Sequence, residues 1–576
     1  TRAEALAVSK LPGVIAVAPL PERVALTDTS PELVRADDVW VRDPDGAGAL
    51  THAKGDGMVI GVIDTGVSPY NPSFAPTPGM QNPLGAGNYL GVCAGTRWDP
   101  AWGPFPCNEK LIGMYSWPAD GDGSGIDTAG FDLNGHGSHT ASTAAGAPVT
   151  AHAYDLDLAI TGIAPNASIV MYGGCCFAGG LDLVPAIDQA AQDAAAGLLD
   201  VINYSVGAEG PGDPYTDFDA VAFYYIRLIA DTFVAVSNMN EGPEYFTAGS
   251  PATAPWVTSV AATATARSFR TDVAVTDGGD THLLAAAVMA DPLGPKGIAT
   301  WDEGDRLCDD PGNHTASYSG KVVVCERGTT SFVQKAVHVL SNGGVGMIVV
   351  NAGPSMSDPD AAIPIDLPIP GFMISNNQGQ ALYAFLDGHP SAEVSWATSV
   401  HTDDPGRVDM IGEFSSRGPN LAVDVVNPSL SAPGVDILAA VTDPDDPTHA
   451  VWGAMSGTSM ASPHVAGAAL LLRQLHPDWT AAEVQSALMT TAVPSVTDLD
   501  TAHADIYTQG SGRLDIGRAA DAGLLFDIDP GDFAWIAERD LNLPSFADSQ
   551  CVLTCAWTRV AANVDPSVTW TAGVTI

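Results

Sequence analysis

The stretch Met58-Val59-Ile60-Gly61-Val62-Ile63-Asp64-Thr65-Gly66-Val67 sets the expectation for the fold of this 576-residue chain. Its run of aliphatic, mostly β-branched residues is typical of a strand that is buried on both faces, as in a parallel sheet. The run ends in Asp64. Because open α/β sheets carry their sites at the carboxyl ends of their strands, this aspartate is a candidate site residue. An Asp-Gly turn without any chemical role is the alternative interpretation.

Strands and helices alternate after this stretch. The predicted elements are, in chain order, a strand at 169–172, a helix at 183–198, a strand at 201–207, a helix at 217–230 and strands at 232–237 and 257–262. This alternation predicts an α/β fold with a doubly wound, mostly parallel sheet.

Changes in this pattern indicate the domain boundaries. Residues 275–404 carry short strands and one helix but no reactive motif, which predicts an inserted, mainly-β domain. The α/β domain then has a first part at 27–274 and a second part at 405–525. Residues 1–26 read as the end of a small separate unit, and residues 526–576 change to short β segments.

The net charge of the chain is −44, from 67 acidic and 23 basic side chains. A surface this negative repels phosphate backbones and anionic lipid, which argues against nucleic-acid and membrane-surface partners. No apolar run reaches the length of a membrane span.

The eight cysteines fall in locally spaced pairs, which indicates disulfides and an oxidising compartment. No CxxC with a matching second half supports the zinc alternative. We predict the pairs Cys93–Cys107, Cys308–Cys325 and Cys551–Cys555. Adjacent Cys175-Cys176 could form a strained vicinal bridge or stay reduced.

A second candidate residue lies in the stretch Asp132-Leu133-Asn134-Gly135-His136-Gly137-Ser138-His139, which opens a helix of small residues. Flanking glycines expose His136 at the first turn, and histidine suits proton transfer near neutral pH. His136 and His139 could instead bind a metal ion, but no third ligand follows from the sequence, and we favour a general base.

A third candidate lies in Gly457-Thr458-Ser459-Met460-Ala461-Ser462-Pro463-His464, which precedes an apolar helical run. Gly457 permits a tight turn, and Pro463 is tolerated only near a helix start. At that position the helix end favours the negative charge that an acyl-transfer nucleophile such as Ser459 develops. A buried helix with a capping serine is the alternative.

Together these three residues supply the parts of a nucleophilic triad. A histidine takes the proton of a serine, and an aspartate fixes the imidazole tautomer and stabilises its positive charge. The order Asp64, His136, Ser459 differs from the orders in chymotrypsin-like enzymes and α/β-hydrolases. The serine motif also lacks the second glycine of GxSxG, which disfavours an esterase.

The three motifs resemble those of subtilisin-like serine proteases (subtilases) with an inserted protease-associated domain, in the cucumisin-like branch or its bacterial relatives. The resemblance covers most of the chain and extends through three further stretches, Ile163-Ala164-Pro165, Phe414–Pro419 and Ala432–Ala440. It implies a secreted serine endopeptidase that works through an acyl-enzyme intermediate, with protein or peptide substrates.

Site residues follow from the resemblance. Asp64, His136 and Ser459 match the catalytic triad, and Asn240 matches the oxyanion-hole asparagine. The segment Ser205-Val206-Gly207 matches the strand that pairs with the substrate backbone.

One position departs from the family pattern. Subtilases usually have Ala-Gly before the oxyanion asparagine, where it lines the primary specificity pocket, whereas this chain has Asn238-Met239. We expect the larger side chain to narrow or reshape that pocket.

The resemblance has further implications. Residues 1–26 match the tail of an inhibitory propeptide, so the enzyme would be made as a zymogen with its own propeptide as inhibitor. Residues 526–576 match the start of a fibronectin-III-like β-sandwich. Catalysis would need no cofactor, and a structural calcium ion is compatible with the family, although no metal ligand set is identified. The alternative is a catalytically weak binding or adhesion protein on a subtilase scaffold.

Overall fold

The computed structural model describes residues 29–41, 53–95, 98–99, 103–117, 130–132, 134–153, 156–173, 183–208, 210, 212–287, 292–301, 306–309, 317–327, 332–352, 369–397, 400–443, 446, 448–498, 502–564 and 567–571. The propeptide assignment at 1–26 and the pair Cys175-Cys176 lie outside the described residues.

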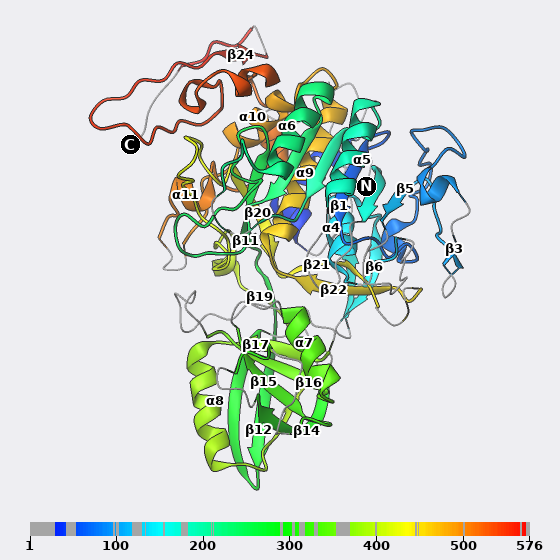
Figure 1. The fold of residues 1–576 in the computed structure, drawn as a ribbon, viewed down its shortest axis with the longest axis vertical. Helices are drawn as coiled ribbons and strands as arrows, with labels where there is room; N and C mark the ends of the chain where they lie inside the picture. Colours follow the sequence, from blue (N-terminus) through cyan, green and yellow to red (C-terminus); the bar gives the residue numbers. More distant parts are fainter. Residues whose placement is uncertain are drawn as a thin grey trace, which may run out of the picture.

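An eight-stranded sheet forms the centre of the larger part of the molecule (Figure 1). Every neighbouring pair in it is parallel, which confirms the predicted α/β fold. The strands are, in spatial order, β2 (Leu90–Gly91), β5 (Leu111–Ser116), β8 (Ser168–Gly173), β1 (Val59–Asp64), β9 (Val201–Tyr204), β10 (Phe233–Ser237), β11 (Thr258–Ala264) and β20 (Leu430–Val435).

Strand β1 lies between β8 and β9, and all six of its residues are buried. Its side chains alternate between two hydrophobic cores, as the two-residue period of a strand requires. Ile60 and Val62 belong to the core that contains residues of α4 (His136–Ala145) and α9 (Thr458–Leu475). Val59 and Ile63 belong to the core on the other face, which contains residues of two further helices, α5 (Val184–Ala195) and α6 (Phe218–Ala230).

Small residues let α9 lie very close to its neighbours. A methyl group added at Gly467 would lie 2.9 Å from the carbonyl oxygen of Ala144 in α4, a distance that backbone packing does not allow. Close packing of α4 and α9 therefore depends on the glycine. The first turns of both helices lie near the carboxyl ends of strands β1 and β9, because His136 contacts Asp64 and Ser459 contacts Ser205.

Residues 267–403 contain a second eight-stranded sheet with hydrophobic cores of its own (Figure 1). The helices and strands of this region are, in chain order, β12 (Arg267–Asp277), β13 (Asp280–Ala287), β14 (Leu293–Thr300), β15 (Val322–Glu326), α7 (Phe332–Ser341), β16 (Gly346–Val350), β17 (Gly371–Ile374), α8 (Asn376–Gly388), β18 (Glu393–Trp396) and β19 (Val400–Asp403). Strand β12 begins at Arg267, before the boundary expected at 275.

Other predicted features have clear outcomes. The disulfides Cys93–Cys107, Cys308–Cys325 and Cys551–Cys555 are present, as predicted. Helix α10 (Ala481–Thr490) begins with a capping box formed by Thr480 and Glu483. Within the described residues, no helix is both long and apolar enough to cross a membrane.

Short elements complete the structure. They are α2 (Ser30–Leu33), α3 (Ala36–Trp40), η1 (Pro72–Phe74), η2 (Val92–Ala94), β3 (Trp98–Asp99), β4 (Gly103–Pro104), β6 (Val149–Ala153), β7 (Leu156–Ile160), η3 (Pro405–Arg407), β21 (Ile437–Val441), β22 (Val451–Met455), α11 (Ile506–Gln509), α12 (Ile516–Ala519), β23 (Leu524–Phe526), η4 (Pro530–Ala534), η5 (Glu538–Asp540) and β24 (Ala561–Asn563).

Candidate active site

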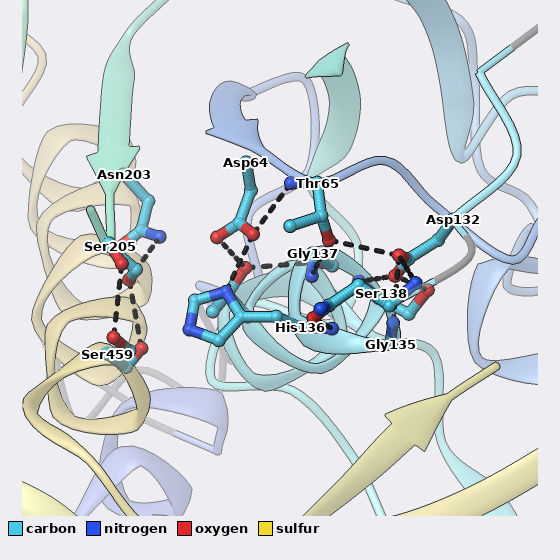
Figure 2. Close-up of polar contacts among 12 residues, drawn as sticks. Asp64, Thr65, Asp132, Gly135, His136, Gly137, Ser138, Asn203, Ser205 and Ser459 are labelled. Carbon is cyan, nitrogen blue, oxygen red and sulfur yellow. Dashed lines mark hydrogen bonds and ion pairs between the residues drawn. The ribbon is translucent and has the colours of Figure 1, made fainter. Parts of the chain in front are cut away.

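Asp64 lies at the carboxyl end of β1, where it is fully buried. Its Oδ1 accepts hydrogen bonds from Nδ1 of His136 at 2.7 Å and from the main-chain N–H of Thr65 at 2.8 Å. Its Oδ2 accepts a hydrogen bond from the Thr140 hydroxyl at 3.0 Å. Figure 2 shows the contacts of Asp64 with His136 and Thr65. Three donors hold the carboxylate in place, and because Nδ1 of His136 donates to it, Nε2 of the neutral ring is the acceptor.

Asp132 organises the turn that precedes α4, and it is also fully buried. Its Oδ1 accepts from the Thr65 hydroxyl at 3.0 Å and from the main-chain N–H groups of Asn134 and Gly135 at 2.9 Å each. Its Oδ2 accepts from the main-chain N–H and the hydroxyl of Ser138, at 2.9 and 2.7 Å. This carboxylate therefore fixes the start of the helix that carries the histidine.

The electrostatics of His136 follow from these two carboxylates. Burial by itself lowers the pKa of the imidazole, because the protein interior disfavours the charged form. The charge of Asp64, its hydrogen bond and the charge of Asp132 outweigh that effect, and the pKa of His136 is raised above its ordinary value. The imidazole is thus a stronger base than a free histidine, with 26 % of its side chain exposed.

Ser459 lies in the first turn of α9, and it is joined to Ser205 by two hydrogen bonds. The Ser459 hydroxyl donates to the carbonyl oxygen of Ser205 at 3.1 Å, and the Ser205 hydroxyl donates to the carbonyl oxygen of Ser459 at 2.9 Å. In a regular α-helix the N–H of residue 463 would donate a hydrogen bond to the carbonyl oxygen of Ser459, but Pro463 has no N–H. The Ser205 hydroxyl takes the place of that donor.

Asn203 links this pair to the next turn of α9. Its Nδ2 donates to the Ser205 hydroxyl at 3.0 Å, and its Oδ1 accepts from the Ser462 hydroxyl at 2.8 Å. All three side chains are buried. A buried network between β9 and α9 therefore sets the position of the serine.

Asp64 and His136 are hydrogen-bonded to each other, whereas Ser459 is hydrogen-bonded to Ser205 at the end of the neighbouring strand β9. In Figure 2 the imidazole of His136 lies between Asp64 and Ser459, and its second nitrogen faces the side on which the serine lies. The Ser459 hydroxyl donates to the Ser205 carbonyl, so it must release that hydrogen bond before it can donate to the imidazole. Hydrogen bonds of this kind are commonly loose before substrate binds.

Asn240 lies beside the first turn of α9. Its Oδ1 accepts from the main-chain N–H of Thr458 at 2.9 Å and from the Thr458 hydroxyl at 3.0 Å. Since an N–H can only donate, the oxygen of the amide must face Thr458, and the amide nitrogen remains as a donor toward other groups.

The other predicted substrate residues differ in accessibility. Val206 and Gly207 follow the carboxyl end of β9 and are partly exposed, whereas the Ser205 side chain is buried. The Asn238 side chain is fully buried and donates to the carbonyl oxygen of Ser416 at 2.6 Å, so it supports the neighbouring loop and has no surface open to substrate. Met239 is partly exposed and has a left-handed backbone, with φ of 76°.

His136 and His139, the pair considered as a metal site, have different hydrogen-bond partners. The buried His139 ring has its Nε2 2.7 Å from the carbonyl oxygen of Ile437, whereas His136 bonds Asp64. No group of three or more metal-ligating side chains gathers among the residues that the structure describes.

Sequence comparisons identify the family. Residues 55–512 match the model of the Subtilase family. The chain is 34% identical over 528 residues to Subtilisin-like protease SBT1.6 of Arabidopsis thaliana, a match that covers 83% of this chain and 65% of the relative. It is also 34% identical over 516 residues to Subtilisin-like protease SBT1.4 of the same plant, covering 83% of this chain and 64% of the relative.

The chain therefore spans about 65% of the length of the first of these relatives. Among solved structures it is similar to the psychrophilic subtilisin-like protease Apa1 from the Antarctic psychrotroph Pseudoalteromonas sp. AS-11. The sequence identity is 17%, the TM-score is 0.34, and the match covers 82% of this chain and 95% of that chain. The family model, by contrast, matches most of the sequence, and this chain belongs to the subtilase family.

Proposed function

We propose that this protein is a secreted serine endopeptidase that hydrolyses peptide bonds through an acyl-enzyme intermediate. The observation that carries this proposal is the 2.7 Å hydrogen bond between Nδ1 of His136 and the buried carboxylate of Asp64, on an imidazole that faces Ser459. Family membership and the raised pKa of His136 support the same reading.

The chemistry follows from the positions of the three side chains. Nε2 of His136 accepts the hydroxyl proton of Ser459 while Oγ attacks the carbonyl carbon of the scissile peptide bond. The charge of Asp64 stabilises the imidazolium that forms. The imidazolium then donates its proton to the leaving amine, and water releases the acyl group by the same steps in reverse order.

The negative charge of the tetrahedral intermediate needs donors. In the proposed mechanism these are Nδ2 of Asn240, whose Oδ1 is bonded to Thr458, and the main-chain N–H of Ser459 at the start of α9. Removing one such donor typically lowers turnover by about 10²–10³-fold. The partly exposed backbone of Val206 and Gly207 would pair with the backbone of the substrate.

Several wider assignments belong to the same proposal. Three disulfide bonds fit an oxidising, extracellular compartment. The predicted domain at 275–404, whose separate sheet begins at Arg267, would be the protease-associated domain, and residues 526–576 would begin a fibronectin-III-like β-sandwich. Residues 1–26 would inhibit the enzyme until they are cleaved. Catalysis would need no cofactor, and a structural calcium ion is compatible with the family.

Casein hydrolysis by purified variants tests this function. Ser459→Ala should reduce hydrolysis to background, because the attacking oxygen is gone. Ser391→Ala removes an exposed serine hydroxyl from the second sheet region and should retain full activity. Hydrolysis that survives in the Ser459 variant would refute the assignment.

A further inference from the structure

Met239 holds a backbone conformation that residues with a side chain rarely adopt. Its φ is 76°, in the left-handed region where a Cβ meets the neighbouring carbonyl. The conformation is fixed by its surroundings, because the carbonyl oxygen of Met239 accepts a 3.0 Å hydrogen bond from the N–H of Ser416, and the Ser416 hydroxyl accepts one from the N–H of Glu241 at 2.9 Å. The direction of the methionine side chain is therefore set by the backbone.

Two glycines border the space that this side chain occupies. Gly207 and Gly249 lie on neighbouring segments, which are joined where the N–H of Ala208 donates to the carbonyl oxygen of Ser250 at 2.9 Å. A methyl group added at Gly207 would lie 2.8 Å from Sδ of Met239, and one added at Gly249 would lie 2.7 Å from its Cγ. The thioether chain thus packs directly against both α carbons and fills the slot that the glycines leave.

This slot lies next to the reacting groups of the proposed mechanism. Met239 directly precedes Asn240, and Gly207 follows two residues after Ser205, whose carbonyl oxygen is 3.1 Å from Oγ of Ser459. A scissile carbonyl held between Ser459 and Asn240 places the side chain of the residue that owns this carbonyl beside the glycine-lined slot.

We propose that Met239 closes this slot, so that the enzyme cleaves after residues with very small side chains, namely glycine, alanine and serine. This inference rests on the proposed peptidase function. A phenylalanine or leucine at that position of the substrate would need the volume that the methionine already occupies.

A matched set of peptide p-nitroanilides tests the inference. The substrates are succinyl-Ala-Ala-Pro-X-p-nitroanilides with X as alanine, leucine or phenylalanine, and kcat/KM is measured for each. The unmodified protein should prefer alanine over phenylalanine by at least about tenfold, within the range by which pockets discriminate side-chain size. Met239→Gly should raise kcat/KM for phenylalanine at least about tenfold while the alanine value stays within about threefold.

Phe246→Gly is the control for backbone effects. Phe246 also has a left-handed backbone, with φ of 67°, but its side chain is 46 % exposed. Glycine there relieves the same kind of strain without opening the slot, and the preference for alanine should persist. If Met239→Gly does not fold, Met239→Ala shortens the side chain and should raise the phenylalanine rate in the same direction.

The possible results distinguish a failure of this inference about Met239 from a failure of the proposed peptidase function. A protein that hydrolyses phenylalanine or leucine substrates as well as alanine ones is a peptidase in which Met239 moves aside, and that result overturns the inference alone. An increase in phenylalanine hydrolysis with Phe246→Gly that equals the increase with Met239→Gly also overturns it. Absence of hydrolysis for all three substrates, together with no hydrolysis of casein, overturns the proposed function itself.

Discussion

Ser459 and Ser205 exchange hydrogen bonds, since the hydroxyl of each residue donates to the main-chain carbonyl of the other, at 3.1 and 2.9 Å. The carbonyl of Ser459 needs this partner because Pro463 cannot supply the helical N–H. Ser205 thereby holds the proposed nucleophile from a neighbouring strand end, and this contact spans 254 positions of the sequence.

Ser205→Ala should lower kcat with little change in KM. The substitution leaves the carbonyl of Ser459 and Nδ2 of Asn203 without their partner, which should also cost about 1–3 kcal/mol of unfolding free energy. Steady-state kinetics and urea denaturation measure both effects. Ser205→Thr keeps a hydroxyl and should restore most of kcat. A rise in KM alone would mean that Ser205 acts on the substrate and does not position Ser459.

Asp64→Asn should shift the acid limb of the pH–rate profile to lower pH and lower kcat by roughly 10⁴-fold. The negative charge of Asp64 raises the pKa of His136, so its removal lowers that pKa and leaves the imidazole neutral at more acidic pH. The rate falls because asparagine no longer fixes the tautomer or stabilises the imidazolium. The measurement is kcat/KM for a peptide amide from pH 4 to 9. An acid limb that stays in place would contradict the role of Asp64.

Asp132→Asn should destabilise the fold by about 3 kcal/mol, since hydrogen bonds to a charged group contribute about 1.5–3 kcal/mol each. Both carboxylate oxygens of Asp132 accept hydrogen bonds, so in either orientation the NH₂ group of the substituted asparagine would face N–H or O–H donors and could not accept from them. Loss of the Asp132 charge should also lower the pKa of His136 and move the acid limb of the profile to lower pH.

The exposed Asp157 provides the control for Asp132, because its side chain is 76 % exposed. Asp157→Asn should change the free energy of unfolding by less than about 0.5 kcal/mol. Equal effects of the two substitutions in urea denaturation would show that the Asp132 network does not hold the turn before α4.

Lys110→Met should destabilise the protein by roughly 2–4 kcal/mol, because buried acceptors lose their donor. The fully buried ammonium donates to the carbonyl oxygens of Ala145, Pro165 and Ala167 at 2.8, 2.6 and 2.8 Å. Lys296→Met, at an exposed strand position, should have little effect.

The stability difference between Lys110→Met and the unmodified protein should depend on pH. Burial lowers the pKa of Lys110 to about 7, against an opposing contribution from the charge of Asp56. Between pH 7 and the unfolded pKa of about 10.5, Lys110 is protonated in the unfolded chain but mostly neutral in the folded protein. Because the unfolded state binds more protons in this range, the free energy of unfolding of the unmodified protein rises with pH. The difference should therefore widen by up to about 1.4 kcal/mol per pH unit above pH 7. A constant difference from pH 7 to 9 would show that Lys110 stays charged.

Much of the fold follows from local sequence patterns. The buried run before Asp64, the alternation around 183–262 and the capping box at Thr480 each reflect forces that act within a few residues, and the structure contains all three. The start of β12 at Arg267 was not predicted. Only two residues separate it from β11, so no turn pattern marks the change of sheet.

Sequence motifs single out the candidate reactive residues, but they do not single out the residues that support them. Asp132 occurs in the histidine motif, and a carboxylate ahead of a helix start is a recognisable signal for its role. The bond from Thr140 to Asp64 and the pairing of Ser205 with Ser459 depend on tertiary packing between distant segments, which no local pattern encodes. The departure at Met239 is visible in the sequence, but its packing against Gly207 depends on how the fold brings the two segments together.

The central claim is that Ser459 is the acylated nucleophile. Incubation with a fluorophosphonate, followed by intact-mass analysis and peptide mapping, tests it most directly. We predict one adduct per chain on the peptide that contains Ser459, formed much more slowly in Asp64→Asn and not formed in Ser459→Ala. An adduct on another residue, or no adduct on the intact protein, would contradict the claim.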